Sequence, residues 1–395
     1  MSFDKKTIRD IDLRGKTVLV RAMLNVPIEN GRIDDTMRLK AALPTLKYLL
    51  EQDTAIILLS HHSREGQSLA PVAPLLSELL GKPIKFVADC AGEAAGAAAA
   101  SIKPGEILML ENLRFDPGEE ANDDAFARRL ASYGQVYVND DFTTCHRSHA
   151  SLVGIPKYLP AVAGLALEKE VTTITDALEN PKRPLVAVAG GAKISTKVPI
   201  LSFLLQKVDV LFIGGAMANT FLAAGGLPIG KSLNEPDQIE AAKQIMASAA
   251  SQGKTLLLPV DAVVTTDVEM AIDIRTIAVQ DVGEADIIAD IGPASAGQLD
   301  TAIRPEGTVI WNGPVGIAEH PAFAHGTEAV AEKIISSGAY SVIGGGDTAD
   351  YVNNAGLGSR FGFVSTGGGA SLELMSGNKL PGIEALQGKD GSMVQ

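Results

Sequence analysis

The sequence predicts an α/β protein built on two doubly wound parallel sheets, one in each half of the chain, and three observations support this fold class. The first is length, because 395 residues exceed what one hydrophobic core usually serves. The second is a series of short, continuous apolar runs, which are typical of strands buried on both faces. The third is that helical patterns alternate with these runs, as right-handed βαβ crossovers require.

The apolar runs are distributed over the whole chain. Each is rich in Val, Ile or Leu and is followed by polar, basic or glycine residues. In the first half they read KTVLVRAML, AIILLSHH, EILMLENLRF and QVYVNDDF, and in the second half PLVAVAGGAK, VDVLFIGGAM, TLLLPVDAVV, TVIWNGPVG, YSVIGGGDT and FGFVSTGGGAS. Both halves are therefore expected to be Rossmann-like domains, with these runs as parallel strands.

Helical segments are recognisable between the runs, because apolar residues recur at steps of three and four in RLKAALPTLKYLLEQ and DQIEAAKQIMASAASQ. A helical stretch over 161–178, with prolines near both ends, is the best candidate for a hinge helix between the domains. The expected organisation is an N-terminal domain over 1–160, this connector, a C-terminal domain over 179–380, and a segment over 381–395 that returns to the N-terminal domain.

Composition and charge restrict the possible functions. The chain is 46% hydrophobic and 21% charged, with 40 dispersed glycines and 20 dispersed prolines, as in a globular protein. Its net charge of −13 argues against a general surface for nucleic acids or anionic membranes, so an anionic ligand must be bound by a local basic cluster. Two cysteines, no signal peptide and no long apolar span predict a cytoplasmic protein.

Basic side chains and histidines follow the strands of the first half. In open parallel sheets, ligands bind beyond the carboxyl ends of the strands. Guanidinium groups bind phosphate and carboxylate in a bidentate manner, so this pattern predicts a site for a compact anion. The residues that form the pattern are Arg21, Arg38, His61, Arg64, Arg114, His146 and Arg147.

The segment VNDDFTTCHRSHAS, residues 138–151, has three other interpretations. Its Asp, Cys and His residues are metal-ligand types, although their spacing matches no recognised zinc pattern. Cys145 and His146 are candidates for a nucleophilic pair, but adjacency in sequence does not orient their side chains. A polar loop with capping Asp and Thr residues also fits. The anion site is the interpretation that the other strand ends support.

Glycines and lysines follow the strands of the second half. In AVAGGAKISTKV, Lys193 and Lys197 are four residues apart, which predicts two ammonium groups on one face of an opening helical turn. An anion between them, or a solvated lysine face, would explain the pair. IGGGDTAD and STGGGAS place glycines directly before a helix, where backbone N–H groups face an anion. Asp347 is a hard oxygen ligand that suits magnesium on a nucleotide.

A literal P-loop pattern occurs at GGLPIGKS, Gly225–Ser232. A P-loop needs a strand before it and a helix after it, whereas AMANTFLAA before it has a helical pattern and LNEPDQ follows. A glycine-rich helix end that leads into a loop is the better interpretation.

Taken together, the motifs resemble the phosphoglycerate kinase family, in order and over nearly the whole chain. The resemblance implies reversible, in-line phosphoryl transfer between 1,3-bisphosphoglycerate with MgADP and 3-phosphoglycerate with MgATP, with domain closure, in glycolysis. The matching segments are VRAMLNVP, DDTMRLKAALPTL, LLSHHSR, ENLRF, VNDDFTTCHRSHAS, LPAVAGLALEKE, GGAKISTK, GGAMANTF, WNGPVG, GGGDTA and VSTGGGASLELMSGNKLPG.

The resemblance also implies roles for individual positions. Arg38 and Lys197 are expected to be catalytic at the transferring phosphoryl group, and a monomer without nucleic-acid or membrane partners is expected. His146 and His149 are expected to support the site by hydrogen bonding. The implied phosphoglycerate ligands are Asn25, Arg38, His61, Arg64, Arg114 and Arg147. The implied nucleotide and magnesium site comprises Lys193, Lys197, Asn312, Glu319, Gly345, Gly346, Asp347 (the metal ligand) and Thr348, with Gly367, Gly368 and Gly369 as the helix N-terminus at the phosphoryl group.

Several positions depart from the usual family pattern. None of the departures removes an arginine or lysine expected at phosphate, so the resemblance predicts an active kinase. The alternatives are a weakened or silent relative that binds nucleotide, and a P-loop NTPase that uses Gly225–Ser232. The departures are Met23 and Thr196 in place of Asp, His62 and Ser63 within the SHLGR motif, and Asp141, Thr143 and Ala216 at usual small-residue or glycine positions.

Overall fold

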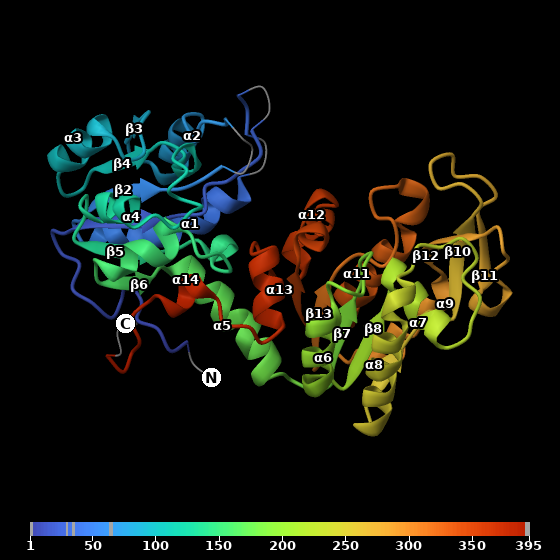
Figure 1. Cartoon of the computed structure of the whole chain (residues 1–395). Coiled ribbons are helices and arrows are strands. Elements are labelled where there is room, and N and C mark those ends of the chain that lie inside the picture. The colour runs from blue at the N-terminus through green and yellow to red at the C-terminus, as the bar shows by residue number, and fades with distance from the viewer. Residues whose placement is uncertain (1–2, 29–30, 34–35, 63–65, 392–395) are drawn as a thin grey trace. The chain divides into compact units, whose positions relative to one another are not determined.

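The computed structural model describes residues 3–28, 31–33, 36–62 and 66–391, and their contacts divide the chain into two compact units (Figure 1). Unit 1 comprises Met1–Thr172 and Lys379–Gln395, and unit 2 comprises Thr173–Asn378. Each unit has its own six-stranded parallel sheet and its own hydrophobic core. The two sheets confirm the predicted α/β fold class.

The sheet of unit 1 has the strand order β3-β4-β2-β1-β5-β6, and every neighbouring pair is parallel. The central strands are almost wholly buried, which explains their continuous apolar runs. Arg21, the last residue of β1, is level with Leu59 of β2 and Asn139 of β5, so the loops after these strands meet at one edge. The strands are β1 (Thr17–Arg21), β2 (Ala55–Leu59), β3 (Ile84–Val87), β4 (Ile107–Leu110), β5 (Val136–Asn139) and β6 (Ala161–Ala163).

Local sequence signals fix the helices of unit 1. The Asp123 carboxylate accepts a hydrogen bond from Phe126 N at 2.7 Å and begins α4. Gly81 ends α2 in the left-handed conformation, with φ of 69°. The C-terminal segment belongs to this unit, since Gln387 N donates to Ala161 O at 3.0 Å. The helices are α1 (Met37–Glu51), α2 (Val72–Leu80), α3 (Glu93–Ser101), α4 (Asp124–Ala131) and α14 (Pro381–Glu384).

The connector differs from the helix predicted over 161–178. Residues Ala161–Ala163 form strand β6, because pairing with β5 at the sheet edge takes up their backbone hydrogen bonds. Helix α5 follows as Leu165–Glu179. The Asp140 carboxylate accepts a hydrogen bond from Ala166 N at 2.9 Å and so defines the helix start. Helix α5 begins in unit 1 and ends in unit 2.

The parallel sheet of unit 2 has the strand order β15-β14-β13-β7-β8-β9. Its strands are β7 (Leu185–Ala189), β8 (Val210–Ile213), β9 (Thr255–Leu257), β13 (Thr308–Asn312), β14 (Tyr340–Gly344) and β15 (Phe363–Val364). Its helices are α6 (Val198–Lys207), α7 (Ala216–Ala224), α8 (Ile239–Ser251), α9 (Pro293–Gly297), α10 (Leu299–Ala302), α11 (His325–Ser337), α12 (Gly346–Asn354) and α13 (Gly369–Met375).

Unit 2 also contains a small antiparallel sheet, which was not predicted from the sequence. Its strand order is β11-β10-β12, and it has a separate apolar cluster. The run TLLLPVDAVV, interpreted above as one parallel strand, is divided between β9 and β10 at Pro259. Proline lacks the N–H group that a continuing ladder needs. The strands are β10 (Asp261–Thr265), β11 (Arg275–Ala278) and β12 (Ile287–Ile291).

The segment Gly225–Ser232 is not a P-loop. Helix α7, not a strand, leads into it, and the next element is a short 3-10 turn, Pro236–Gln238. The Ser232 hydroxyl accepts a hydrogen bond from Ile288 N at 2.8 Å, so this side chain has a structural role. Within the described ranges, no helix has the length and hydrophobicity needed to cross a membrane.

Candidate functional site

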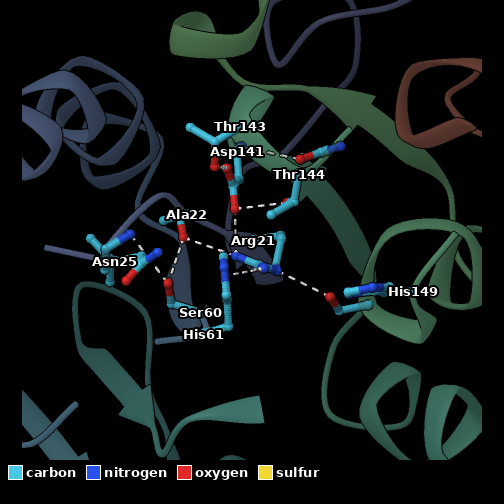
Figure 2. A network of polar contacts seen from close by, with 12 residues as sticks. Arg21, Ala22, Asn25, Ser60, His61, Asp141, Thr143, Thr144 and His149 are labelled. Atoms are coloured by element: carbon cyan, nitrogen blue, oxygen red, sulfur yellow. Dashed lines mark hydrogen bonds and ion pairs between the residues drawn. The ribbon is translucent and has the colours of Figure 1, made fainter. Parts of the chain in front are cut away.

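Arg21 is the centre of a buried polar network at the carboxyl edge of the unit 1 sheet (Figure 2). Its guanidinium has no exposed surface and donates to Asp141 Oδ2 at 2.8 Å and to Ser151 Oγ at 3.0 Å. It also donates to the Ala22 carbonyl at 3.1 Å and lies 2.8 Å from His61 Nδ1. Because it is enclosed by protein, Arg21 fixes its neighbours rather than reaching a ligand.

Asp141 is the counter-ion of this arginine and is itself fully buried. Its carboxylate also accepts hydrogen bonds from the hydroxyls of Thr143 and Thr144, the latter at 3.0 Å. Burial raises the pKa of Asp141, but the charge of Arg21 and the other partners outweigh this effect and bring the pKa below its ordinary value. Asp141 is therefore ionised at neutral pH.

His61 follows β2 and is held by Arg21 in one tautomer. Burial, and then the charge of Arg21, lower the pKa of His61 well below its ordinary value, so the ring is neutral. A guanidinium has no acceptor, so His61 Nδ1 must accept the hydrogen bond from Arg21. The ring proton is consequently on Nε2, which makes His61 a hydrogen-bond donor.

Arg114 lies in the 3-10 turn Leu113–Phe115 after β4, where the Asn112 side chain accepts from Arg114 N at 3.0 Å. Its Nε lies 3.0 Å from Glu120 Oε1. Burial lowers the pKa of Arg114; Glu120 opposes this shift, and the nearby charges of Arg147 and Arg21 add to it. Repulsion among these arginines favours binding of an anion beside them.

A second buried acid supports the network from the other side. Glu119 has no exposed surface and accepts from Ser151 N at 2.9 Å and from Ser151 Oγ at 2.6 Å. His149 Nδ1 lies 3.9 Å from Glu119 Oε1. Burial, followed by the charges of Arg114 and Arg147, lowers the pKa of His149 to about 4, so this ring is neutral at neutral pH.

Of the remaining residues predicted for this site, Arg38 lies on α1, Asn25 on the loop after β1 and Arg147 on the loop after β5. Arg38, in the first turn of α1, donates to the backbone carbonyl of Asn25 and ties the helix to the loop after β1. Arg147 is exposed. Arg64 lies outside the described residues.

The structure does not support the metal and nucleophile interpretations of residues 138–151. Cys145 is fully buried, and its thiol donates to the Asp141 carbonyl at 3.3 Å. Burial raises the pKa of this thiol, which leaves it unreactive. Asp140 accepts hydrogen bonds from Thr45 Oγ1 and Ala166 N. In the part of the chain that the structure describes, no group of three or more His, Cys, Asp or Glu side chains is placed to hold a metal ion.

Two residues of unit 1 that depart from the family pattern, Met23 and His62, are buried. Met23 is 4% exposed. His62 is also buried, and its Nε2 donates to the Val26 carbonyl at 2.9 Å, because a carbonyl can only accept. The ring of His62 therefore braces the loop after β1.

In unit 2, glycines bring the loops after β7, β8 and β13 into direct backbone contact. Gly190 N donates to Asn312 O at 2.8 Å, and Gly191 N donates to Pro314 O at 2.9 Å. A Cβ on Gly190 would lie 2.1 Å from Pro314 O. Gly215 has φ of 67°, and a Cβ there would lie 2.6 Å from Gly191 O. Only glycine fits these two positions.

Lys197 is directed at the end of β13. It is the N-cap residue of α6, and its Nζ donates to Asn312 Oδ1. Burial lowers the pKa of Lys197, whereas the charge of Asp347 opposes this shift. The Nδ2 of Asn312 is buried and has no hydrogen-bond partner within the described residues. A cation, a free amide donor and an acid thus converge at the carboxyl edge of this sheet.

The predicted helical pairing of Lys193 with Lys197 is wrong. Helix α6 begins at Val198, and Lys193 lies exposed in the loop before it. Pro199 explains the difference, because proline is tolerated only in the first turn of a helix. The Thr196 hydroxyl donates to the Lys193 carbonyl at 3.1 Å and shapes this loop.

The glycine segment before α12 exposes two of its predicted residues. Gly345 has φ of 86° and caps the helix, and Gly346 and Asp347 are exposed in its first turn. Thr348 has no exposed surface, and its hydroxyl accepts from Gly313 N at 2.6 Å. Thr348 thus joins α12 to the loop after β13.

The second glycine segment, Gly367–Gly369, lies beside the first. Gly368, with φ of 50°, is the N-cap residue of α13, and Gly367 N donates to Ser365 Oγ at 3.1 Å. Ser371 of α13 accepts a hydrogen bond from Gly345 N at 3.2 Å. This contact holds the two helix starts together.

A cavity of about 360 Å³ opens beside these loops within unit 2. Its walls are mainly apolar and come from α7, β12 and the loop after β13, with Glu319 and Asp347 among the lining residues. A mainly apolar cavity of this size suits a nucleobase, while the exposed Glu319 and Asp347 can provide polar contacts. The apolar part of the lining includes Leu222, Leu233, Ala262, Ile288, Val315 and Ile317.

The structural roles of Asp141, Ser151 and Glu119 were not predicted from the sequence. Asp141 was noted only as a departure from a pattern. Glu119 and Ser151 are 32 residues apart and lie in no common motif. Only the fold brings them together, so no sequence signal identified the pair.

Comparisons with known proteins agree on one family. A family model described as phosphoglycerate kinase matches residues 8–378. The chain is 48% identical over 391 residues to a phosphoglycerate kinase of Moorella thermoacetica, with 98% of this chain and 100% of that one covered. It is 49% identical over 390 residues to one of a Roseiflexus species, with 97% and 99% covered.

Solved structures give the same answer. The structure of phosphoglycerate kinase from Coxiella burnetii superimposes with a TM-score of 0.87 at 39% identity, covering 96% of this chain and 98% of that one. Phosphoglycerate kinase from Pyrococcus horikoshii gives a TM-score of 0.83 at 29% identity, with the same coverage of 96% and 98%.

Proposed function

The chain belongs to the phosphoglycerate kinase family, and from that membership we propose that its two sites divide the substrates, with the phosphoglycerate in unit 1 and the adenine nucleotide in unit 2. Phosphoglycerate kinase is the glycolytic enzyme that transfers a phosphoryl group reversibly between 1,3-bisphosphoglycerate and ADP. The family establishes the reaction, and the assignment of residues below is our proposal.

The observation that carries the proposal is the basic edge of the unit 1 sheet. Arg147 lies close enough to Arg114 for its charge to lower the pKa of the Arg114 guanidinium, as expected of a site that binds an anion. His61 adds a neutral hydrogen-bond donor. Arg38 lies on α1, and Asn25 lies on the loop after β1, where its backbone carbonyl accepts from Arg38. We assign these five residues, with Arg64, to the phosphoglycerate.

Unit 2 supplies the features that a nucleoside with phosphates requires. The apolar cavity would take the base, with Glu319 near the nucleoside. Lys197, Lys193 and the N-terminus of α12 at Gly345 and Gly346 would meet the phosphates. Asn312, whose amide N–H groups lack a protein partner among the described residues, and Thr348 complete the assignment.

The chemistry needs charge neutralisation and alignment but no general base. The acceptor oxygen is already an anion in both directions of the reaction, so positioning and electrostatic stabilisation supply the catalysis. We assign Arg38 and Lys197 to the phosphoryl group in transfer, together with backbone N–H groups of Gly367, Gly368 and Gly369.

Asp347 is suited to hold magnesium with the nucleotide. Its carboxylate is a hard oxygen donor, is exposed in the first turn of α12 and acts electrostatically on Lys197. Magnesium on a nucleotide commonly takes one or two protein carboxylates, and phosphate and water fill the other positions. When bound, the ion would offset phosphate charge. Asp347 itself would orient the nucleotide through that ion.

Because the proposed sites are on separate units, we propose that transfer requires closure, with α5 and the C-terminal segment as the hinge. Closure would exclude water from the acyl phosphate. A monomeric state and a cytoplasmic location also belong to this proposal.

The proposal is tested by 3-phosphoglycerate- and ATP-dependent turnover with magnesium in a coupled assay. We expect Arg38→Ala to lower kcat by about a hundredfold or more, because a charge at the transferring group is lost. Arg128→Ala is the matched control, since Arg128 is an exposed arginine of unit 1 paired with Asp124 on α4. It should retain wild-type turnover.

Two outcomes would contradict the proposal. Equal activity of Arg38→Ala and Arg128→Ala would remove Arg38 from the catalytic residues. Absence of turnover in the wild-type protein that still binds ATP would instead identify a silent relative.

A further inference from the structure

Asp141 is an ionised, fully buried carboxylate that the reaction as proposed does not use. The family resemblance predicts a small residue at this position, so the carboxylate is a feature of this chain. Two threonines, Thr143 and Thr144, donate their hydroxyls to it, and Arg21 donates at 2.8 Å. These contacts form a built arrangement rather than an incidental surface charge (Figure 2).

The ion pair fixes where the guanidinium of Arg21 lies. Four hydrogen bonds of Arg21 reach Asp141, Ser151, Ala22 and His61, and no part of the side chain is exposed. A buried arginine without its counter-ion is strongly unfavourable, so the loss of Asp141 would displace Arg21 or bring in water. The contact between Arg21 Nη2 and His61 Nδ1 would then be lost.

That contact decides what His61 can do for a ligand. While Arg21 donates to Nδ1, the ring carries its proton on Nε2, so this nitrogen is the hydrogen-bond donor of the ring. Without Arg21, both tautomers become available to the ring. The charged or titratable groups that act on His61 are Arg21, Asp141, Arg114 and His149.

We propose that Asp141 is a positioning residue for the phosphoglycerate site, which acts through Arg21 to hold His61 as an Nε2–H donor to the bound anion. The inference rests on the proposed assignment of His61 to the phosphoglycerate. It also links two departures from the family pattern. Met23 lies in the loop after β1 where the family pattern has a carboxylate, and Asp141 adds a carboxylate in the loop after β5, where it pairs with Arg21.

The first test is kinetic. Asp141→Ala should raise KM for 3-phosphoglycerate by about tenfold, while KM for ATP changes less than about twofold, because only one substrate meets His61. Asp141→Asn keeps the side-chain volume and one acceptor but loses the charge, so it should give a smaller increase. Asp124→Asn, which removes an exposed carboxylate paired with Arg128, is the matched control and should leave both constants unchanged.

The second test reads the histidine directly. In ¹⁵N-histidine-labelled protein at pH 7, with His61 assigned by its absence from His61→Gln, the ring nitrogens of the wild type should show a neutral Nε2–H tautomer. In Asp141→Ala the signal should change to a mixture of tautomers. If that variant does not fold, Asp141→Asn provides the same comparison.

The outcomes separate this inference from the assignment of the site. A folded Asp141→Ala protein with unchanged KM for 3-phosphoglycerate, or a wild-type ring protonated on Nδ1, would overturn the role of Asp141. If the tautomer depends on Asp141 but 3-phosphoglycerate binds without shifting the His61 signals, the assignment of His61 to the substrate is what fails.

Discussion

At the scale of single residues, the two lysines after β7 occupy different environments although they are four positions apart. Lys197 is half-buried and bonded to Asn312 at the end of β13. Lys193 is exposed in the preceding loop. A partly desolvated ammonium interacts more strongly with phosphate than an exposed one, because water screens it less.

Lys197→Ala should therefore lower kcat/KM for ATP by about a hundredfold or more, the size of effect seen when one preorganised charge or donor is removed. Lys193→Ala should lower it less. Lys207→Ala, at the other end of α6, removes a lysine that pairs with Glu179 and serves as the control. Steady-state kinetics with varied MgATP measure all three. An equal loss in Lys193→Ala and Lys197→Ala would show that burial does not distinguish them.

The positions of these residues were predictable only in part. Motif order identified Lys197, Asn312 and Asp347 as candidates, because the glycine segments around them are distinctive. The environment of Lys197 was not predictable, since the bond to Asn312 joins residues 115 positions apart. The start of α6 could have been predicted from the sequence, because proline is favoured in the first turn of a helix and Pro199 marks that turn.

At the scale of elements, the start of α5 depends on a buried acid. Asp140 Oδ1 accepts from Ala166 N at 2.9 Å and from Thr45 Oγ1 at 2.8 Å, and Thr45 Oγ1 in turn accepts from Leu165 N. Burial raises the pKa of Asp140 to about 7. The folded chain consequently keeps a proton on this carboxyl at pH values where the unfolded chain has lost it.

The sign of the resulting pH dependence follows from the raised pKa. Between the ordinary Asp value near 4 and about 7, the folded state binds more protons than the unfolded state, so stability falls as pH rises. We expect the wild type to lose about 2 kcal/mol of unfolding free energy in unit 1 between pH 5 and pH 7.5 relative to Asp140→Asn. Hydrogen exchange of β1 and β5 amides at both pH values measures it.

An internal control is available in unit 2. Trp311, the single tryptophan of the chain, is buried in the core of unit 2, so its fluorescence reports that unit. Its urea transition should be the same in the wild type and Asp140→Asn. Parallel pH profiles of β1 and β5 exchange in the two proteins would contradict the role given to Asp140.

Elements were predictable where one physical signal dominated. Continuous apolar runs identified the central strands because these are buried on both faces. The prediction of one strand for TLLLPVDAVV was wrong, because the segment is continuously hydrophobic although the chain passes from one sheet to the other at Pro259. The prediction of helix for residues 161–163 was wrong for a related reason. Three apolar residues before a helix have no periodicity that distinguishes a short edge strand from a helical turn.

At the scale of the whole molecule, each unit has its own core and its own candidate site. A net charge of −13 makes the chain repel anions at long range, so binding at the proposed sites would depend on local cations in unit 1 and on helix N-termini and lysines in unit 2. Each ligand should therefore stabilise mainly the unit that contacts it, because a ligand that binds only the folded state adds its binding free energy to that state.

Hydrogen exchange with one ligand at a time tests this separation. At about a hundred times its dissociation constant, MgADP alone should raise the opening free energy of β7, β13 and β14 amides by about 2.7 kcal/mol, and 3-phosphoglycerate alone should do the same for β1, β2 and β5. Lys197→Ala should weaken the first effect and Arg38→Ala the second. Nucleotide protection confined to unit 1 would reverse the assignment of substrates, because slower exchange in a unit reports binding to its folded state.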